Sequence, residues 1–227
     1  MAPQKDTEAS QAAPQSPARG EATHRASPSA RLIDGLAERG FAVVDGLLAL
    51  PLVAELRARA AELSTAGALH PARIGRGAQE RRASDVRGDF IAWLEEPQLD
   101  AEQQLLARVE ALRLEMNREL AAGLVEFEGH FAVYPPGAAY TRHSDRPSGS
   151  DARAISFVLY LNDAWSSDDG GALRIYDETG GFIDVLPAGG RAVAFQSERF
   201  EHEVRPARRE RLSFTGWFRR RTLDELA

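Results

Sequence analysis

Three side chains in the second half of the chain have the types and spacing of a metal site. His143 and Asp145 are two residues apart, and residues i and i+2 of a β-strand project from the same face. His202 opens a predicted strand further along. Two histidines and one carboxylate on a β-scaffold are the ligand set of non-haem iron(II) sites, which leave positions open for other ligands. The alternative interpretation is a surface histidine beside an aspartate in a loop.

An arginine in the last predicted strand strengthens the case for a site. Arg211 lies nine residues after His202. A guanidinium that points into a β-barrel is costly unless it meets an anion, and it can hold a carboxylate through two parallel hydrogen bonds. The alternative is that Arg211 is one more solvated arginine, like 219–221 nearby. Alternation gives one strand face the polar and small side chains of a ligand-lining wall, namely Arg211, Ser213, Thr215 and Trp217.

The second half of the sequence predicts the β-scaffold that these residues require. Short segments rich in β-branched and aromatic residues are separated by turn residues, including three Gly-Gly pairs. The expected strands are Phe127–Tyr134, Ala154–Leu161, Ala172–Tyr176, Phe182–Val185, Arg191–Phe195, His202–Val204 and Arg211–Phe218. Strands of this length and spacing are typical of a sandwich or jelly roll.

The first half of the chain has helical periodicity. Apolar spacing predicts a helix over Arg31–Arg39, a second that begins at Pro51, and a third from about Asp100 to Leu124. Phe41–Val44 is a short apolar run typical of a strand. The segment His70–Val86 is rich in Arg and Gly and predicts a long mobile loop, and such loops are often functional. Helices that precede strands favour packing of the helices on one outer face of the sheets.

Composition excludes several classes of protein. The chain has 227 residues, of which 43% are apolar, enough for a substantial core. No apolar run is long enough to cross a membrane, so no membrane partner is expected. The absence of cysteine excludes a disulfide scaffold, a cysteine-ligated metal and a thiol nucleophile. The net charge of −6 makes nucleic acid an unexpected partner.

Residues 1–30 differ from the rest of the chain. They are rich in Ala, Pro and Ser and have no apolar stretch, which predicts a disordered tail rather than a signal peptide. A cytoplasmic location is therefore expected. Residues 31–227 are expected to form one domain, with helical support over 31–125 and a jelly-roll core over 126–220. We expect a monomer.

Five segments carry a resemblance to a known family. They are Val86–Leu94 (VRGDFIAWL), Tyr134–Asp145 (YPPGAAYTRHSD), Leu159–Trp165 (LYLNDAW), Gly170–Ile175 (GGALRI) and His202–Val204 (HEV), with Arg211 and Trp217 after them. On these residues the sequence resembles the iron(II)- and 2-oxoglutarate-dependent dioxygenases. It resembles in particular the prolyl hydroxylase domain group, which includes the hypoxia-sensing prolyl hydroxylases and their bacterial relatives. The resemblance runs from about Ile74 to Phe218.

The resemblance implies an α+β, mainly β fold: a double-stranded β-helix, or cupin-like jelly roll, with supporting N-terminal helices. It implies Fe(II), 2-oxoglutarate and O2 as cofactor and co-substrates, with ascorbate as reductant. The implied site residues are His143, Asp145 and His202 as iron ligands, Arg211 as partner of the distal carboxylate of 2-oxoglutarate, and Tyr160, Tyr134 and Thr215 as further residues of the co-substrate pocket.

The resemblance also points to residues near the substrate. Asp89 and Arg153 match positions beside the active site, and we predict that they form an ion pair. Trp217 is a further candidate for substrate contact, whereas Trp93 is expected to pack in the core. His130 shares a predicted strand face with Tyr134. We expect His130 to form a hydrogen bond to a metal ligand or to have a structural role, and not to act as a fourth metal ligand.

Three functional hypotheses follow. The first is an enzyme that hydroxylates a prolyl residue in a protein substrate, with translation elongation factor Tu as a target suggested by the bacterial relatives. The second is an oxygenase of a small molecule such as a free amino acid. The third is a metal-free binding module that has lost turnover. The long arginine-rich segment favours the first, and the complete set of His143, Asp145, His202 and Arg211 argues against the third.

Overall fold

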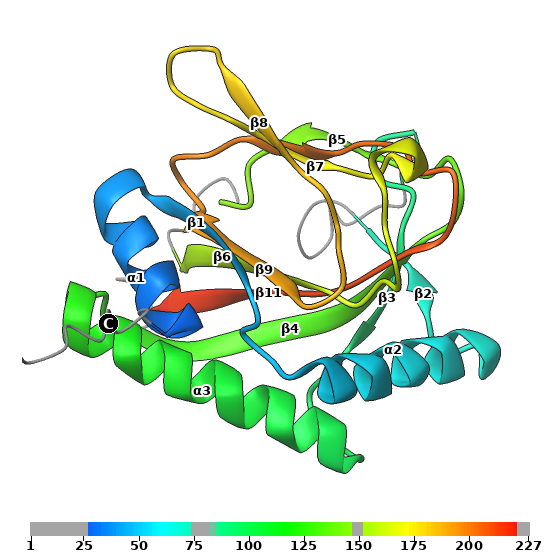
Figure 1. The fold of residues 1–227 in the computed structure, drawn as a ribbon, viewed down its shortest axis with the longest axis horizontal. Helices are drawn as coiled ribbons and strands as arrows, with labels where there is room; N and C mark the ends of the chain where they lie inside the picture. Colours follow the sequence, from blue (N-terminus) through cyan, green and yellow to red (C-terminus); the bar gives the residue numbers. More distant parts are fainter. Residues whose placement is uncertain (1–26, 74–82, 84, 147–151, 222–227) are drawn as a thin grey trace, which may run out of the picture.

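Two antiparallel sheets face each other in the structure, a computed structural model that describes residues 27–73, 83, 85–146 and 152–221 (Figure 1). The larger sheet has seven strands in the order β1 (Phe41–Asp45), β9 (Arg191–Gln196), β6 (Arg153–Tyr160), β11 (Arg211–Arg220), β4 (Leu124–Tyr134), β3 (Phe90–Trp93) and β2 (His70–Pro71). The smaller sheet has four, in the order β5 (Tyr140–His143), β10 (His202–Val204), β7 (Leu173–Tyr176) and β8 (Phe182–Val185). The predicted jelly roll is confirmed.

Strand β11 divides its side chains between the core and a cavity, as alternation predicts. It pairs with β4 on one side and with β6 on the other. Leu212, Phe214 and Phe218 join the apolar core on one face. The opposite face carries Arg211, Ser213, Thr215 and Trp217, which line a narrow cavity between the two sheets.

Three helices cover the outer side of the larger sheet (Figure 1). They are α1 (Pro28–Arg39), α2 (Leu50–Thr65) and α3 (Asp100–Leu120), and a short 3-10 helix, η2 (Ser167–Asp169), lies in the β half. The N-terminus of α1 is capped by the Ser27 side chain, and α1 ends at Gly40, whose φ of 78° suits glycine. At the start of α3, Glu102 accepts hydrogen bonds from the Gln98 and Leu99 amides and pairs with Arg59 of α2 at 2.7 Å. These contacts join two helices behind the sheet.

The predicted elements are present, with differences at their ends. All seven strands expected in the second half occur within one to three residues of the predicted bounds. The third helix ends at Leu120 rather than Leu124, because Ala121 adopts a left-handed φ of 50° and β4 begins at Leu124. Strands β2, β3 and β5 were not predicted, and β2 lies at the start of the segment that was expected to form a loop.

Several expectations fall on residues that the structure leaves undescribed. Residues 1–26 of the predicted tail and 74–82 of the predicted mobile loop lie outside the described part, although His70 and Pro71 form β2 rather than loop. The division of the chain at residue 30 stays a prediction, and α1 already begins at Pro28.

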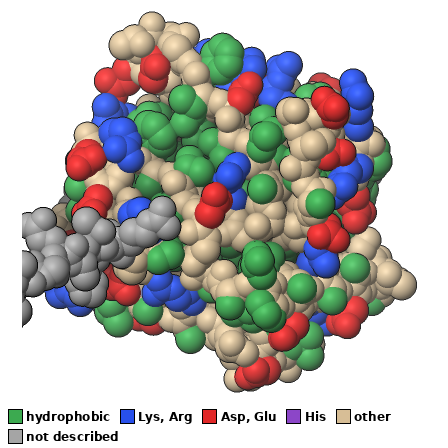
Figure 2. Space-filling model, viewed as in Figure 1, with side chains coloured by type: hydrophobic (Ala, Val, Ile, Leu, Met, Phe, Trp, Pro, Cys, Tyr) green, Lys and Arg blue, Asp and Glu red, His purple; other side chains and the backbone are tan. Residues whose placement is uncertain are grey.

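Charged side chains of both signs are interspersed over the face shown in Figure 2. Among the described helices, none combines the length and the apolar character needed to cross a membrane.

Candidate active site

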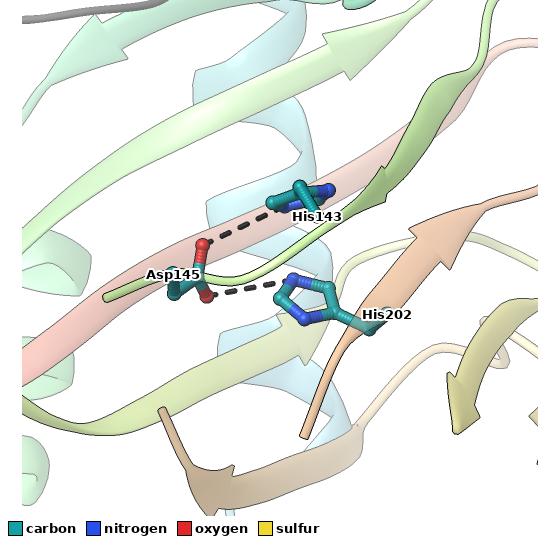
Figure 3. A group of neighbouring side chains, drawn as sticks. All are labelled: His143, Asp145 and His202. Atoms are coloured by element: carbon teal, nitrogen blue, oxygen red, sulfur yellow. Dashed lines mark ion pairs between the residues drawn. The ribbon is translucent and has the colours of Figure 1, made fainter. Parts of the chain in front are cut away.

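His143, Asp145 and His202 converge at the edge of the smaller sheet, and Asp145 lies two residues beyond the end of β5 rather than on a strand with His143 as expected (Figure 3). His143 ends β5 and His202 begins β10, and the two residues are direct partners in the pairing of these strands. Oδ1 of Asp145 lies 3.6 Å from Nε2 of His143, and Oδ2 lies 3.5 Å from Nε2 of His202. One ligand atom from each residue lies within 4.8 Å of the others, so the three residues could hold one metal ion.

Backbone carbonyls select which imidazole nitrogen faces Asp145. Nδ1 of His143 lies 2.7 Å from the carbonyl oxygen of Thr141, and Nδ1 of His202 lies 3.4 Å from that of Phe200. A carbonyl oxygen only accepts hydrogen bonds, so each Nδ1 carries the proton and each Nε2 presents a lone pair. Metal-binding histidines are oriented in this way. The arrangement therefore fits a metal ion before one is bound.

Tyr140 gives His143 a second constraint. The two rings are stacked, with 3.5 Å between their centroids and 13° between their planes. Tyr140 comes three residues before His143 on the same short strand. Tyr140 lines the cavity but was not among the predicted site residues. The strand that places it beside His143 was not predicted, so nothing in the sequence indicated the contact.

The charges of the cluster suit a cation. Burial disfavours the ionised form of Asp145, but the neighbouring histidines and a hydrogen bond from Ser156 outweigh burial and hold the pKa of this carboxyl well below its usual range. Burial is also the main reason that the pKa of His202 falls to about 4. At neutral pH the site thus offers an ionised carboxylate and a neutral His202, the forms that bind metals.

Two buried serines support the carboxylate from behind. The hydroxyl of Ser156 on β6 donates to Oδ2 of Asp145 at 2.7 Å and lies 2.9 Å from the hydroxyl of Ser197. Sequence reasoning missed both serines. The sequence did offer one indication for Ser156: it is a small polar residue inside an otherwise apolar stretch of β6. It shares a strand face with Val158, which lines the cavity.

Arg211 is a buried cation in the same cavity. Its side chain is only 2% exposed, and its Nε donates to the Gly171 carbonyl at 2.9 Å. Within the described residues no carboxylate lies within 4.0 Å of it. A buried charge of this kind is costly until an anion compensates it. The site therefore has a place for an anionic ligand next to the His–Asp–His cluster.

Two tyrosines flank this cation. The guanidinium carbon of Arg211 lies 5.1 Å from the ring centroids of Tyr134 and Tyr160. Burial raises the pKa of both phenols, which keeps them neutral donors. Tyr134 and Thr215 line the cavity as expected. Tyr160 is not part of the lining, and its hydroxyl is buried beside Arg211 without a hydrogen-bond partner.

The predicted ion pair between Asp89 and Arg153 is wrong. Asp89 accepts two hydrogen bonds from Arg87, at 2.7 and 2.9 Å. Arg153 pairs with Glu128 at 2.7 Å, and its guanidinium carbon lies 3.5 Å from the centroid of the Trp217 ring. Each of the two residues pairs with one that is closer in sequence than the predicted partner. Asp89 still lines the cavity, and Arg153 lies beside the expected substrate residue Trp217.

The rings of His130, Trp93 and Trp217 lie together beside the cavity. Trp93 was expected in the core, but it is 48% exposed and lies edge-on to His130, with 4.8 Å between ring centroids. His130 is 1% exposed and is not part of the His–Asp–His cluster, so the structure gives no support for a fourth ligand. Trp217 lines the cavity as predicted.

Comparison with known proteins places these features in context. Residues 129–219 match the 2OG-Fe(II) oxygenase superfamily. The chain is 32% identical to the human prolyl hydroxylase EGLN3 over 195 residues, which cover 82% of this chain and 81% of the relative. A Pseudomonas putida prolyl-4-hydroxylase structure is similar at 44% identity with a TM-score of 0.79, over 86% of this chain and 100% of that one. A Trichoplax adhaerens prolyl hydroxylase, solved with a hypoxia inducible factor oxygen degradation domain peptide, is similar at 29% identity with a TM-score of 0.76, over 84% and 88% of the two chains.

Proposed function

Because the chain belongs to the 2OG-Fe(II) oxygenase superfamily and is a 2-oxoglutarate-dependent dioxygenase of the prolyl hydroxylase type, we propose that it hydroxylates a prolyl residue in a protein. The similar Trichoplax enzyme was solved with a peptide, which supports a peptide substrate here. Elongation factor Tu is the candidate target that the resemblance to bacterial relatives suggests.

One observation carries the proposal: the buried Arg211 shares a cavity with His143, Asp145 and His202. A dicarboxylate such as 2-oxoglutarate would bind with one end at a metal held by His143, Asp145 and His202 and with its distal carboxylate at the Arg211 guanidinium. Arg211 compensates that charge and fixes the orientation of the molecule. A ligand with a single negative charge could pair with the metal or with Arg211, but not with both.

The residues of the chain supply binding, orientation and the exclusion of water. His143, Asp145 and His202 would hold iron(II), and Tyr134 and Thr215 line the pocket beside Arg211. Bound iron(II) with 2-oxoglutarate and O2 supplies the oxidising power that hydroxylates a C–H bond and releases succinate and CO2. Tyr134 and Tyr160, which burial keeps neutral, would donate hydrogen bonds to the bound co-substrate without adding charge, and the narrow cavity would limit the access of solvent to the reacting atoms.

Mass spectrometry of a host lysate tests the proposal. The lysate is incubated with the enzyme, Fe(II), 2-oxoglutarate and ascorbate, the proposed reductant, and peptides are searched for a gain of one oxygen. We expect the gain on proline in one abundant protein, and its loss when the His202→Ala variant is used.

A different result would redirect the assignment. Consumption of 2-oxoglutarate that is stimulated by a metabolite, with no gain of oxygen in any protein, would favour the oxygenase of a small molecule. The monomeric state, the cytoplasmic location and the lack of nucleic-acid and membrane partners stay predictions.

A further inference from the structure

Four buried side-chain polar atoms in the described part of the chain lack a hydrogen-bond partner. They are both ring nitrogens of His130, the Tyr160 hydroxyl and Nε1 of Trp217. Buried polar groups in proteins are nearly always paired, because an unpaired one costs free energy. The proposed co-substrate accounts for Tyr160, which lies beside Arg211. His130 and Trp217 are left without an assigned partner.

These two side chains lie together at the boundary between two cavities. His130 on β4 is opposite Thr215 of β11, two residues from Trp217, and the His130 and Trp217 rings are 5.5 Å apart. Both line the cavity that holds the His–Asp–His cluster. Both also line a groove of about 830 Å³ that extends along β3 to Arg59 of α2. The pair therefore lies where the groove borders the cavity that holds the His–Asp–His cluster.

The chemistry of the pair selects its ligand. Burial, reinforced by the charges of Arg87 and Arg153, lowers the pKa of His130 to about 3, so the imidazole is neutral at physiological pH. A neutral imidazole has one N–H and one lone pair, and the indole only donates. A carboxylate has no hydrogen for the imidazole lone pair, and an ammonium has no lone pair for the indole N–H. An amide offers both a carbonyl and an N–H, side by side.

We propose that His130 and Trp217 form a subsite that hydrogen-bonds the main-chain amide on the C-terminal side of the target proline. This inference rests on the proposed function, since it needs a peptide substrate. The amide before a proline has no N–H, whereas the amide after it supplies a carbonyl for the indole and an N–H for the imidazole. His130 thus acts as a specificity-determining residue.

Trp93 is the side chain that controls access from the groove. Its ring lies against His130, yet 48% of it is exposed. An outward turn of this half-exposed ring would uncover the imidazole for a ligand in the groove. The groove beyond it has charged residues of both signs, including Arg59, Arg73, Glu95 and Glu96. A peptide main chain with mixed side chains suits such a surface.

Two pools of short synthetic peptides test the subsite. Both have random flanks around a central Pro-Ala, and in the second pool lactate replaces the alanine, so that an ester removes only the N–H after proline. Hydroxylation is followed by mass spectrometry under conditions that report kcat/KM. The wild type is expected to favour the amide pool about tenfold, the effect of one hydrogen bond. His130→Met should abolish this preference, and His130→Gln, which keeps a donor and an acceptor, should restore part of it.

Trp217→Phe provides the matched comparison. It should slow both pools equally, because the carbonyl that the indole binds is present in both. Binding of 2-oxoglutarate by calorimetry and thermal melting separate a local effect from misfolding. Equal rates on the two pools for the wild type, or an unchanged preference in His130→Met, would overturn the subsite while leaving the proposed function in place. Failure to hydroxylate either pool would overturn the subsite, whereas the proposed function would fall only if no protein of the lysate gained oxygen on proline.

Discussion

The hydroxyl of Ser156 donates a hydrogen bond of 2.7 Å to Oδ2 of Asp145. The same oxygen lies 3.5 Å from Nε2 of His202, so the bond sets the carboxylate plane relative to the second histidine. Ser197 holds the Ser156 hydroxyl from the other side at 2.9 Å. A chain of two buried hydroxyls therefore orients the only anionic member of the metal cluster.

Replacing Ser156 should weaken metal binding without emptying the site. Outer contacts of this kind are worth roughly 10–100-fold in metal affinity, so we expect that loss for Ser156→Ala when Mn(II) is titrated calorimetrically into metal-free protein. Ser156→Thr keeps the hydroxyl and should bind nearly as the wild type does. Ser144→Ala is the control, since the Ser144 hydroxyl donates a hydrogen bond to the Ser197 carbonyl and not to the Asp145 carboxylate. Equal affinity of Ser156→Ala and the wild type would contradict this role.

His202→Ala should abolish metal binding and turnover of 2-oxoglutarate while the fold persists. His202 is one of three protein ligands, and it belongs to a strand whose pairing with β5 and β7 depends on backbone hydrogen bonds. Circular dichroism should match that of the wild type. Retained binding of Mn(II) with ordinary affinity would remove His202 from the ligand set.

Arg211→Ala should raise the concentration of 2-oxoglutarate needed for half-saturation. Loss of one partner from a buried charged pair costs on the order of 2–5 kcal/mol, which corresponds to at least about a thirtyfold weaker interaction. Arg209→Ala is the matched control, because Arg209 lies over Trp165 and does not line the cavity. An unchanged half-saturating concentration in Arg211→Ala would refute the assignment.

His130 should make stability fall as the pH is lowered. Its pKa in the folded chain is about 3, whereas an exposed histidine titrates near 6.5. Between these values the unfolded chain binds a proton that the folded chain does not, so the free energy of unfolding decreases with decreasing pH. Going from pH 7 to pH 5 should cost about 2 kcal/mol through this residue.

Denaturant unfolding of His130→Met at the two pH values measures this contribution. The variant should depend less on pH, and at pH 7 it should be more stable by about 1 kcal/mol because an unpaired polar ring is gone. His70→Met, at an exposed position, should keep the wild-type dependence. If His130→Met and the wild type lose the same stability, His130 is not buried as a neutral ring.

Asp89→Ala should destabilise the fold. Asp89 and Arg87 form a buried pair, and removing one partner of such a pair typically costs about 3–5 kcal/mol. The double variant Arg87→Leu with Asp89→Ala should recover part of this loss, because no isolated charge is left. Asp184→Ala breaks a more exposed pair with Arg174 and should cost less than about 1 kcal/mol. Equal effects of Asp89→Ala and Asp184→Ala would contradict the argument.

Much of the scaffold could be predicted because its determinants are local. Alternation along β11 correctly separated Arg211 and Thr215 from Leu212 and Phe214. The end of α3 was placed too late because apolar residues continue into β4, although Gly123 marked a break. Strand β2 was missed because the arginine and glycine content of its segment indicates a loop, and β3 and β5 were missed although β8 and β10, which are as short, were predicted.

Pairings between distant residues were harder to predict. Resemblance placed Asp89 and Arg153 near the site, but it gave no register. The strand register places Arg153 opposite Arg219, where its guanidinium can reach Glu128. Arg87 binds Asp89, which is only two residues further along the chain, just before β3. Ser156 and Tyr140 were missed because their roles depend on contacts with metal-binding residues, which only the folded chain reveals.

Strand β11 carries Arg211, the proposed partner of the co-substrate, at one end and Trp217 near the other, with core residues on its reverse side. A strand rises about 3.4 Å per residue, so these two recognition points are roughly 20 Å apart along a rigid backbone. Insertion or deletion of a single residue between them would reverse the facing of every residue on one side of the change, so Arg211 and Trp217 could no longer both face the cavity. A point substitution on the cavity face of β11 therefore changes the lining at one position, whereas a change in the length of the strand disturbs the cavity and the core together.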